Sequence, residues 1–598
     1  MAKNHRCKYL AAFTLPAFLL TAGANAQSGD VIDKIKDEGL NRSQVMQTLS
    51  YLTDVIGPRL TGSPSLKTAN EWTKDRLASW GLQNAHLEPW GPFGRGWQVD
   101  KFSIQVVAPQ QISLIAYPRA WCGGTKSTVT GEVVYIDATD AAGLEKYKGK
   151  LKGAIVMMSA PRELGLITTP QSSRYTDEQL AEMASATAGA PRRQGAGGAP
   201  AGQRRGAQGG QNNFMAQMQL TSIKQKFVED EGAAAEIFIA PGDDGTIYVQ
   251  SATVAPKTLP VAPPAAGGGA PTGGAPVPAA GAPGAGAPAT GGARRQQAAA
   301  PRRVQPWDKD AGKVLPQITV SAENYNRLAR MIQQGVKPRI SLDLSVKFFD
   351  KDLMAYNTIA EIPGTDKKDE IVMLGGHMDS WHSGTGATDN GAGVSVCMEA
   401  VRILQALNIK PRRTIRVALW SGEEEGLFGS RAYVAQHFGS YPQRTGGGMG
   451  FGAAPDPSAP APVLTKKDEY EKLSGYFNLD NGAGKIRGVY LQGNENVRSI
   501  FQEWLQPFQD VGAQTLTIRN TGSTDHVSFD GIGLPGFQFI QDTLEYNTRT
   551  HHSNEDVYDR CPPEDMKQAS IIMAAFIYNT AMREEKLPRK TVTTANNQ

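Results

Sequence analysis

The chain has 598 residues, of which 40% are hydrophobic and 20% charged, and its formal net charge at pH 7 is +4. This length exceeds what a single hydrophobic core supports, so two or more domains are expected. The small positive balance excludes the strongly basic surface on which nucleic-acid binding depends.

Residues 1–26 have the pattern of a secretory signal peptide. Cationic residues precede a short apolar run, which ends in a small-residue cleavage site, Ala24-Asn25-Ala26. The alternative, a membrane anchor, is less favoured because the apolar run is short and is broken by Pro16. Since no later run is long and apolar enough to span a bilayer, we expect a mature protein, cleaved after Ala26, in the periplasm or outside the cell.

Three cysteines follow this leader, Cys122, Cys397 and Cys561, and they are far apart in the sequence. An odd number of widely spaced cysteines does not form a disulfide framework, although it leaves one bridge open. Cys397 lies in a predicted amphipathic helix and is most simply a buried thiol.

Residues 27–124 are expected to be the N-terminal part of a larger α/β domain. Apolar residues recur at helical spacing up to residue 52, and a turn-rich segment follows. A second helix is predicted over residues 66–80, with Gly81 as its C-terminal cap. Residues 97–117 alternate enough between apolar and polar side chains to predict a strand.

Residues 125–349 are predicted to form a separate β-rich domain with one or two helices. Short apolar strands are expected at residues 131–136 and 153–158, and the pattern returns at 233–240 and 315–344. Some stretches rich in Gly, Ala and Pro contain almost no large apolar residue and cannot offset the entropy cost of ordering. We expect these stretches to be mobile, at residues 185–213, 262–303 and 445–462.

Residues 350–598 return to an alternation of strands and helices. Strands and helices are predicted in turn at residues 394–407 (helix), 413–420, 475–480 and 534–541 (strands), and 562–582 (helix). This order is typical of an α/β fold with a mixed, mainly parallel sheet covered by helices on both faces.

Reactive side chains gather at the predicted strand ends of this last region. The apolar run 371–376 leads into His377 and Asp379, and Asp389 follows in the next loop. Open α/β sheets place their sites outside the carboxyl ends of the strands. A His-x-Asp pattern alone is more often structural, so the rest of the chain decides its meaning.

Further carboxylates follow two other predicted strands. Glu423-Glu424-Glu425 comes directly after one strand, and Asp480 ends another. Three adjacent carboxylates repel one another unless a cation lies among them, although a solvated acidic turn is the alternative for this segment alone. His552, near the C-terminal helix, supplies a second imidazole.

A set of imidazoles and carboxylates is typical of zinc and, less firmly, of cobalt or manganese. One carboxylate shared between two ions would hold them roughly 3.5–4 Å apart, as in two-metal hydrolases. A further carboxylate beside the ligands could then take a proton from a water that bridges the two ions.

These segments, in this order, resemble the co-catalytic di-zinc aminopeptidase family, which includes bacterial leucyl aminopeptidases, glutamate carboxypeptidase II and the metal-free transferrin receptor. The resemblance covers residues 30–120 and 350–585. It is carried by His377-Met378-Asp379, Asp389-Asn390, Glu423-Glu424-Glu425-Gly426-Leu427, Asp480 and His552-Ser553.

The resemblance implies a zinc-exopeptidase fold with two zinc ions per subunit. His377 and Asp480 would bind one ion, and Glu424 and His552 would bind the other. Asp389 would bridge both ions, and a cis peptide bond often follows this residue in the family.

The resemblance also implies roles in catalysis and substrate binding. Glu423 would be the general base, and Asp379 would hydrogen-bond His377 and fix its tautomer. Three further residues are candidates for substrate contacts: His551, His526 and Arg519. His551 stands where the family often has a Tyr; simple packing is the alternative for His526, and a solvated surface charge is the alternative for Arg519.

The implied function is that of an exported zinc-dependent exopeptidase, most simply an aminopeptidase, whose partner is a peptide substrate. A carboxypeptidase or dipeptidase of the glutamate carboxypeptidase type stays open, as does a receptor-like relative that has lost catalysis. Residues 125–349 resemble a protease-associated domain, expected to be a lid beside the site or, alternatively, a spacer. The sequence leaves the oligomeric state open, with a homodimer as one option.

Overall fold

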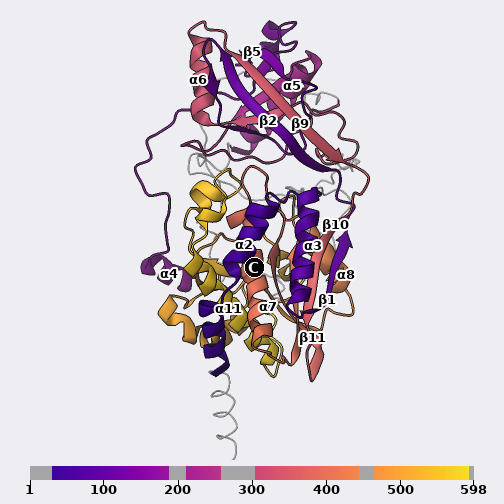
Figure 1. Cartoon of the computed structure of the whole chain (residues 1–598), viewed down its shortest axis with the longest axis vertical. Helices are drawn as coiled ribbons and strands as arrows, with labels where there is room; N and C mark the ends of the chain where they lie inside the picture. Colours follow the sequence, from indigo (N-terminus) through magenta and orange to yellow (C-terminus); the bar gives the residue numbers. More distant parts are fainter. Residues whose placement is uncertain (1–29, 188–209, 258–303, 443–461, 591–598) are drawn as a thin grey trace, which may run out of the picture.

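Two eight-stranded sheets organise the protein. The computed structural model describes residues 30–187, 210–257, 304–442 and 462–590. The expected signal peptide and most residues of the three low-complexity stretches lie outside these ranges. The cleavage of the first and the mobility of the others therefore stay predictions. Figure 1 shows the two sheets as the centres of two domains stacked along the longest axis of the molecule.

The first sheet is the centre of the α/β domain. Its strands lie in the order β1 (Gln83–Trp90), β10 (Ala355–Ile362), β12 (Arg413–Trp420), β11 (Lys367–His377), β15 (Leu473–Asn478), β18 (Gly536–Gln541), β16 (Ile486–Tyr490) and β17 (Thr515–Thr517). The four strands from β12 to β18 run parallel, and antiparallel pairs flank them on both sides. This topology confirms the predicted α/β class with a mixed, mainly parallel sheet.

Helices cover both faces of this sheet because successive residues of its buried strands point in opposite directions. In β11, Val372 and Leu374 pack into one hydrophobic core, and Met373 packs into the other. The first core is covered by α2 (Val45–Ser50), α3 (Pro64–Ser79), α7 (Ala392–Ala406), α9 (Arg498–Leu505) and α11 (Pro563–Met582). The second is covered by α8 (Phe428–His437) and α10 (His526–Asp530).

The second sheet is the centre of the inserted domain. Its strands lie in the order β3 (Ile112–Ser113), β2 (Gly96–Ala108), β9 (Arg339–Phe349), β5 (Val129–Tyr135), β6 (Ile155–Met157), β7 (Ala235–Ile239), β8 (Gln317–Val320) and β4 (Ala116–Pro118). Its helices are α5 (Gly210–Asp230) and α6 (Ala322–Gln333). Between β6 and α5 the chain leaves the inserted domain, and α4 (Asp177–Ala184) lies against β17 of the α/β domain.

The boundary of the inserted domain differs from the expected one. Residues 97–117 do form strands, but β2 pairs with β9 from Gly96–Phe349 to Ala108–Arg339 and so belongs to the second sheet. The inserted domain therefore begins near residue 96 and not at residue 125. Alternation along a sequence shows that a segment is a strand, whereas its sheet is decided by a partner more than two hundred residues away.

Local signals placed other elements correctly. Helix α3 begins after Ser63, whose side chain accepts a hydrogen bond from the Leu66 N–H, and Gly81 follows the helix with a φ of +91°. Strand β1 was not predicted, because it is a partly exposed edge strand without an apolar alternation. Cys122, Cys397 and Cys561 are buried and free, and among the described helices none has the length and apolar character that a membrane crossing needs.

Candidate metal centre

The predicted reactive residues lie at one edge of the first sheet. Strand β11 ends at His377, and the neighbouring parallel strands β12 and β15 are followed by Glu423-Glu424 and by Asp480. The carboxyl ends of parallel neighbours meet at the same edge of a sheet, which is where open α/β folds place their sites. Asp389 lies just before α7, and His552 lies in the loop before α11, which completes the set.

Asp389 lies between the two imidazoles. Its Oδ1 is 3.2 Å from His377 Nε2, and its Oδ2 is 3.2 Å from His552 Nε2. Asp480 Oδ1 is 3.3 Å from His377 Nε2, and Glu424 Oε2 is 2.9 Å from His552 Nε2. The structure thus brings together all five predicted ligands in the pairs that were expected, around the carboxylate expected to be shared.

The donor atoms of this cluster fit cations. Asp389 Oδ2 and Glu424 Oε1 are buried and accept no hydrogen bond, which costs free energy unless a positive charge is near. Burial raises the pKa of Glu424 to about 7, and burial raises the pKa of Glu423 well above its usual value. Imidazole nitrogens and carboxylate oxygens gathered in this way are a donor set that suits zinc and related divalent ions.

The carboxylates around the two imidazoles favour the protonated, positively charged form of each ring. Burial acts to lower the pKa of His377, but the carboxylates of Asp480 and Glu423 raise it well above its usual value. The same opposition holds for His552, where burial is outweighed by Glu424 and Asp389. A proton on each ring offsets part of the negative charge of these carboxylates, and a bound cation would offset more of it.

The role expected for the Asp379 side chain needs correction. His377 Nδ1 lies 3.0 Å from the main-chain carbonyl oxygen of Asp379 but 3.7 Å from its carboxylate Oδ1. The carboxylate Oδ2 instead accepts hydrogen bonds from Thr61 Oγ1 and from the Glu424 N–H, at 3.2 and 3.1 Å. The His377 tautomer is therefore oriented by the peptide carbonyl, whereas the Asp379 side chain holds the segment that carries Glu424.

Two residues that sequence reasoning missed hold the loops of the site. Arg59 is wholly buried, and its guanidinium donates to main-chain carbonyls on both sides of the loop that follows His377. Asp556 accepts from the N–H groups of Thr388 and Asp389, at 2.5 and 3.2 Å. The signals were the turn-rich segment around Arg59 and the position of Asp556 four residues after His552. The peptide bond between Asp389 and Asn390 is cis, as expected.

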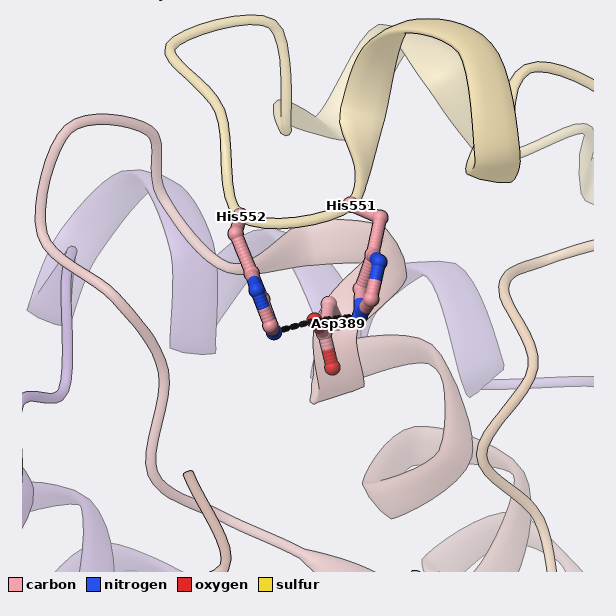
Figure 2. A group of neighbouring side chains, drawn as sticks. All are labelled: Asp389, His551 and His552. Carbon is pink, nitrogen blue, oxygen red and sulfur yellow. Dashed lines mark ion pairs between the residues drawn. The ribbon is translucent and has the colours of Figure 1, made fainter. Parts of the chain in front are cut away.

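The remaining candidates lie at different distances from the centre. Glu423 Oε2 is 4.0 Å from His377 Nε2. Figure 2 shows His551 beside His552 on the same loop, with both rings directed at Asp389. His551 Nε2 lies 3.5 Å from Asp389 Oδ2, and its ring centroid is 3.8 Å from that of His552. Its side chain is 39% exposed.

The other two substrate candidates make hydrogen bonds or ion pairs with residues outside the cluster. His526 is 0% exposed, and its Nε2 lies 3.3 Å from the Thr521 carbonyl oxygen. This burial agrees with packing and speaks against a direct substrate contact. Arg519 forms an ion pair with Glu182 of α4 at 3.4 Å, so a role for Arg519 at the substrate stays a prediction without a supporting contact.

Comparison with known proteins identifies a family for the segment that holds the site. Residues 357–577 match the family model described as peptidase family M28. Carboxypeptidase Q of Pongo abelii is 23% identical over 571 residues, which cover 94% of this chain and 91% of that protein. Aminopeptidase YwaD of Bacillus subtilis (strain 168) is 27% identical over 235 residues, which cover 38% of this chain and 44% of that protein. Matches to carboxypeptidase Q of other vertebrates span about half the length of those proteins.

A solved structure has the same fold. The crystal structure of a peptidase M28 precursor from Shewanella amazonensis SB2B aligns with a TM-score of 0.57 and 20% identity, covering 95% of this chain and 99% of that one. The segment matched by the family model contains the five converging ligands and Glu423. The family match and the geometry thus describe the same site, and we conclude that residues 357–577 form a peptidase family M28 domain and that the chain is a metallo-exopeptidase.

Proposed function

We propose that the chain is an aminopeptidase that removes N-terminal residues from peptides and holds two zinc ions per subunit. The observation that carries this proposal is the placement of Asp389, whose two carboxylate oxygens each face a different imidazole at 3.2 Å. His377 and Asp480 would hold one ion, and Glu424 and His552 the other. Two ions held there would polarise the scissile carbonyl and activate a water for attack.

Glu423 is the residue best placed to move the proton. Its Oε2 lies 4.0 Å from His377 Nε2, and burial raises its pKa well above the usual value, which strengthens the carboxylate as a proton acceptor. It would take a proton from the attacking water and pass it to the leaving amine. His551, whose side chain is 39% exposed and lies 3.5 Å from Asp389, would contact the substrate.

The charges of the site favour a substrate amine over a substrate carboxylate. Buried carboxylates surround the ligands, and these would attract an α-ammonium group. Burial lowers the pKa of the Arg59 guanidinium to about 10, while the nearby carboxylates of Asp556, Asp379 and Asp389 act to raise it. Its Nε, Nη1 and Nη2 all donate to main-chain carbonyls, and the side chain is wholly buried. Arg59 therefore cannot receive the terminal carboxylate of a peptide.

A carboxypeptidase or dipeptidase is the second candidate. The observation in its favour is the alignment with carboxypeptidase Q, which spans 94% of this chain, whereas the aminopeptidase alignment spans 38%. A library of short peptides with free and blocked ends separates the two. Our proposal expects cleavage of peptides with a free amino end and a blocked carboxyl end, and none of the reverse kind. The opposite pattern would establish the second candidate, and cleavage only of free dipeptides would establish a dipeptidase.

Metal dependence is tested on the same protein. We expect two equivalents of zinc by elemental analysis, loss of activity with a chelator, and recovery on adding zinc. Purified protein that binds metal but cleaves no peptide would favour the receptor-like alternative. Export is a further part of the proposal, supported by the pattern of residues 1–26, and N-terminal sequencing of the protein from the periplasm or medium should begin at Gln27.

A further inference from the structure

The inserted domain supplies a side chain to one of the two histidines. Gln250, which follows β7 in the inserted domain, has its Nε2 3.0 Å from Nδ1 of His552. His552 directs its other nitrogen, Nε2, at Asp389 and Glu424. Gln250 therefore contacts the imidazole on the side opposite the expected metal position. The two residues are 302 positions apart in the sequence.

The main chain around Gln250 also holds the loop of His552. The Val249 N–H donates to the His552 carbonyl at 3.1 Å, and Tyr248 forms an isolated antiparallel bridge with Ser553. Ile247 and Asn554 exchange two hydrogen bonds, at 2.7 and 3.1 Å. Residues 247–250 thus act as a short strand beside the ligand loop.

The contacts from residues 247–250 support an unusual backbone conformation at His552. Its φ is +64°, in the left-handed region that residues other than Gly rarely occupy. Such a conformation persists only where surrounding contacts hold it. Beside hydrogen bonds from Ser553 to Arg549 and Thr550 within the loop, residues 552–554 are contacted by the inserted domain. The ligand is therefore supported by a domain that contributes none of the five ligands.

The other imidazole is held differently. His377 Nδ1 finds its partner in the carbonyl oxygen of Asp379, two residues along the same chain segment. The two halves of the centre therefore differ, since the partner of His377 Nδ1 comes from the α/β domain and the partner of His552 Nδ1 comes from the inserted domain.

We propose that Gln250 is a positioning residue for the metal position formed by Glu424 and His552. An imidazole that binds a metal through Nε2 must carry its proton on Nδ1, and a hydrogen-bond acceptor at Nδ1 fixes this tautomer. The carboxamide of Gln250 supplies that acceptor when its Oε1 faces Nδ1, an orientation reached by rotating the amide by half a turn. The inference rests on the proposed metal binding by His552.

The test compares two variants, Gln250→Leu and Gln250→Glu, with a control, Gln98→Leu. Gln98 is an exposed residue of β2 in the same domain. Because the Gln250 side chain is exposed, these variants should fold. Zinc affinity is measured by competition with a chelator. We expect Gln250→Leu to weaken one of the two zinc equivalents by roughly 10–100-fold and to leave the other unchanged. Gln250→Glu keeps an acceptor and should bind both ions at least as tightly as the wild type.

Cobalt(II) gives a second readout that does not depend on activity. The visible spectrum of the fully cobalt-loaded protein should change in Gln250→Leu and stay as in the wild type in Gln98→Leu. If Gln250→Leu binds both zinc ions with wild-type affinity, or weakens both alike, the inference is overturned. If the wild type itself binds no zinc, both the proposed function and the inference fail. If the wild type binds zinc and only the Gln250→Leu result is contrary, the inference alone fails.

Discussion

Arg59→Met removes a guanidinium on which the geometry of the metal centre depends. The guanidinium donates to the carbonyl oxygens of Met378, Thr385 and Gly386 at 2.7, 2.8 and 2.7 Å, and so ties together the loop between His377 and Asp389. Its burial lowers its pKa only to about 10, so it remains charged at neutral pH.

The cost of this substitution follows from the groups left behind. A buried carbonyl that loses its partner costs about 1–3 kcal/mol, so three of them cost roughly 3–9 kcal/mol. The methionine stem refills part of the volume, and we expect a loss of about 5 kcal/mol in the free energy of unfolding. This is comparable to the whole stability of many domains. The matched control is Arg59→Lys, whose ammonium offers three donors without the planar fork and should recover part of the loss.

Urea unfolding followed by circular dichroism measures the stability of both variants, and hydrogen exchange over residues 371–393 measures the local effect. Exchange should accelerate in this segment first, and zinc affinity should fall with it. If Arg59→Met unfolds within about 1 kcal/mol of the wild type and keeps wild-type zinc affinity, the hydrogen bonds of Arg59 do not order the site and the reasoning is refuted.

Three further predictions concern the site and the inserted domain. Glu423→Gln should retain both zinc ions by elemental analysis while peptide turnover falls by about 10²–10⁴-fold, because the proton acceptor is lost; near-normal turnover in the metal-loaded variant would contradict this. Asp389→Ala should lose both zinc ions, and retention of one tight equivalent would show that the carboxylate is not shared. Burial raises the pKa of Glu236 from 4.5 to about 8, so the folded protein holds this proton more tightly than the unfolded chain and loses up to about 5 kcal/mol of stability as the pH rises through that window. Glu236→Gln should therefore match the wild type near pH 4 and be more stable at pH 9 in denaturant titrations; equal pH slopes would disprove the assignment.

The types of residue in the site could be recognised from the sequence because they follow short, strongly patterned elements. Strand β12 has the bounds that were expected, 413–420, and α11 differs by a single residue. Buried strands and amphipathic helices have local periodicity, and the reactive residues come directly after them. The order of the motifs then led to the correct fold class and to the family that residues 357–577 match.

The sequence by itself therefore determined the strongly patterned elements and the reactive side chains that follow them. Only the tertiary structure decided that β2 joins the second sheet, that a peptide carbonyl and not the Asp379 side chain orients His377, and that Gln250 contacts His552. The physical reason is distance along the chain. These contacts join residues through sheet pairing and loop packing, and a local pattern of apolar and polar residues carries no information about the partner of a single polar side chain.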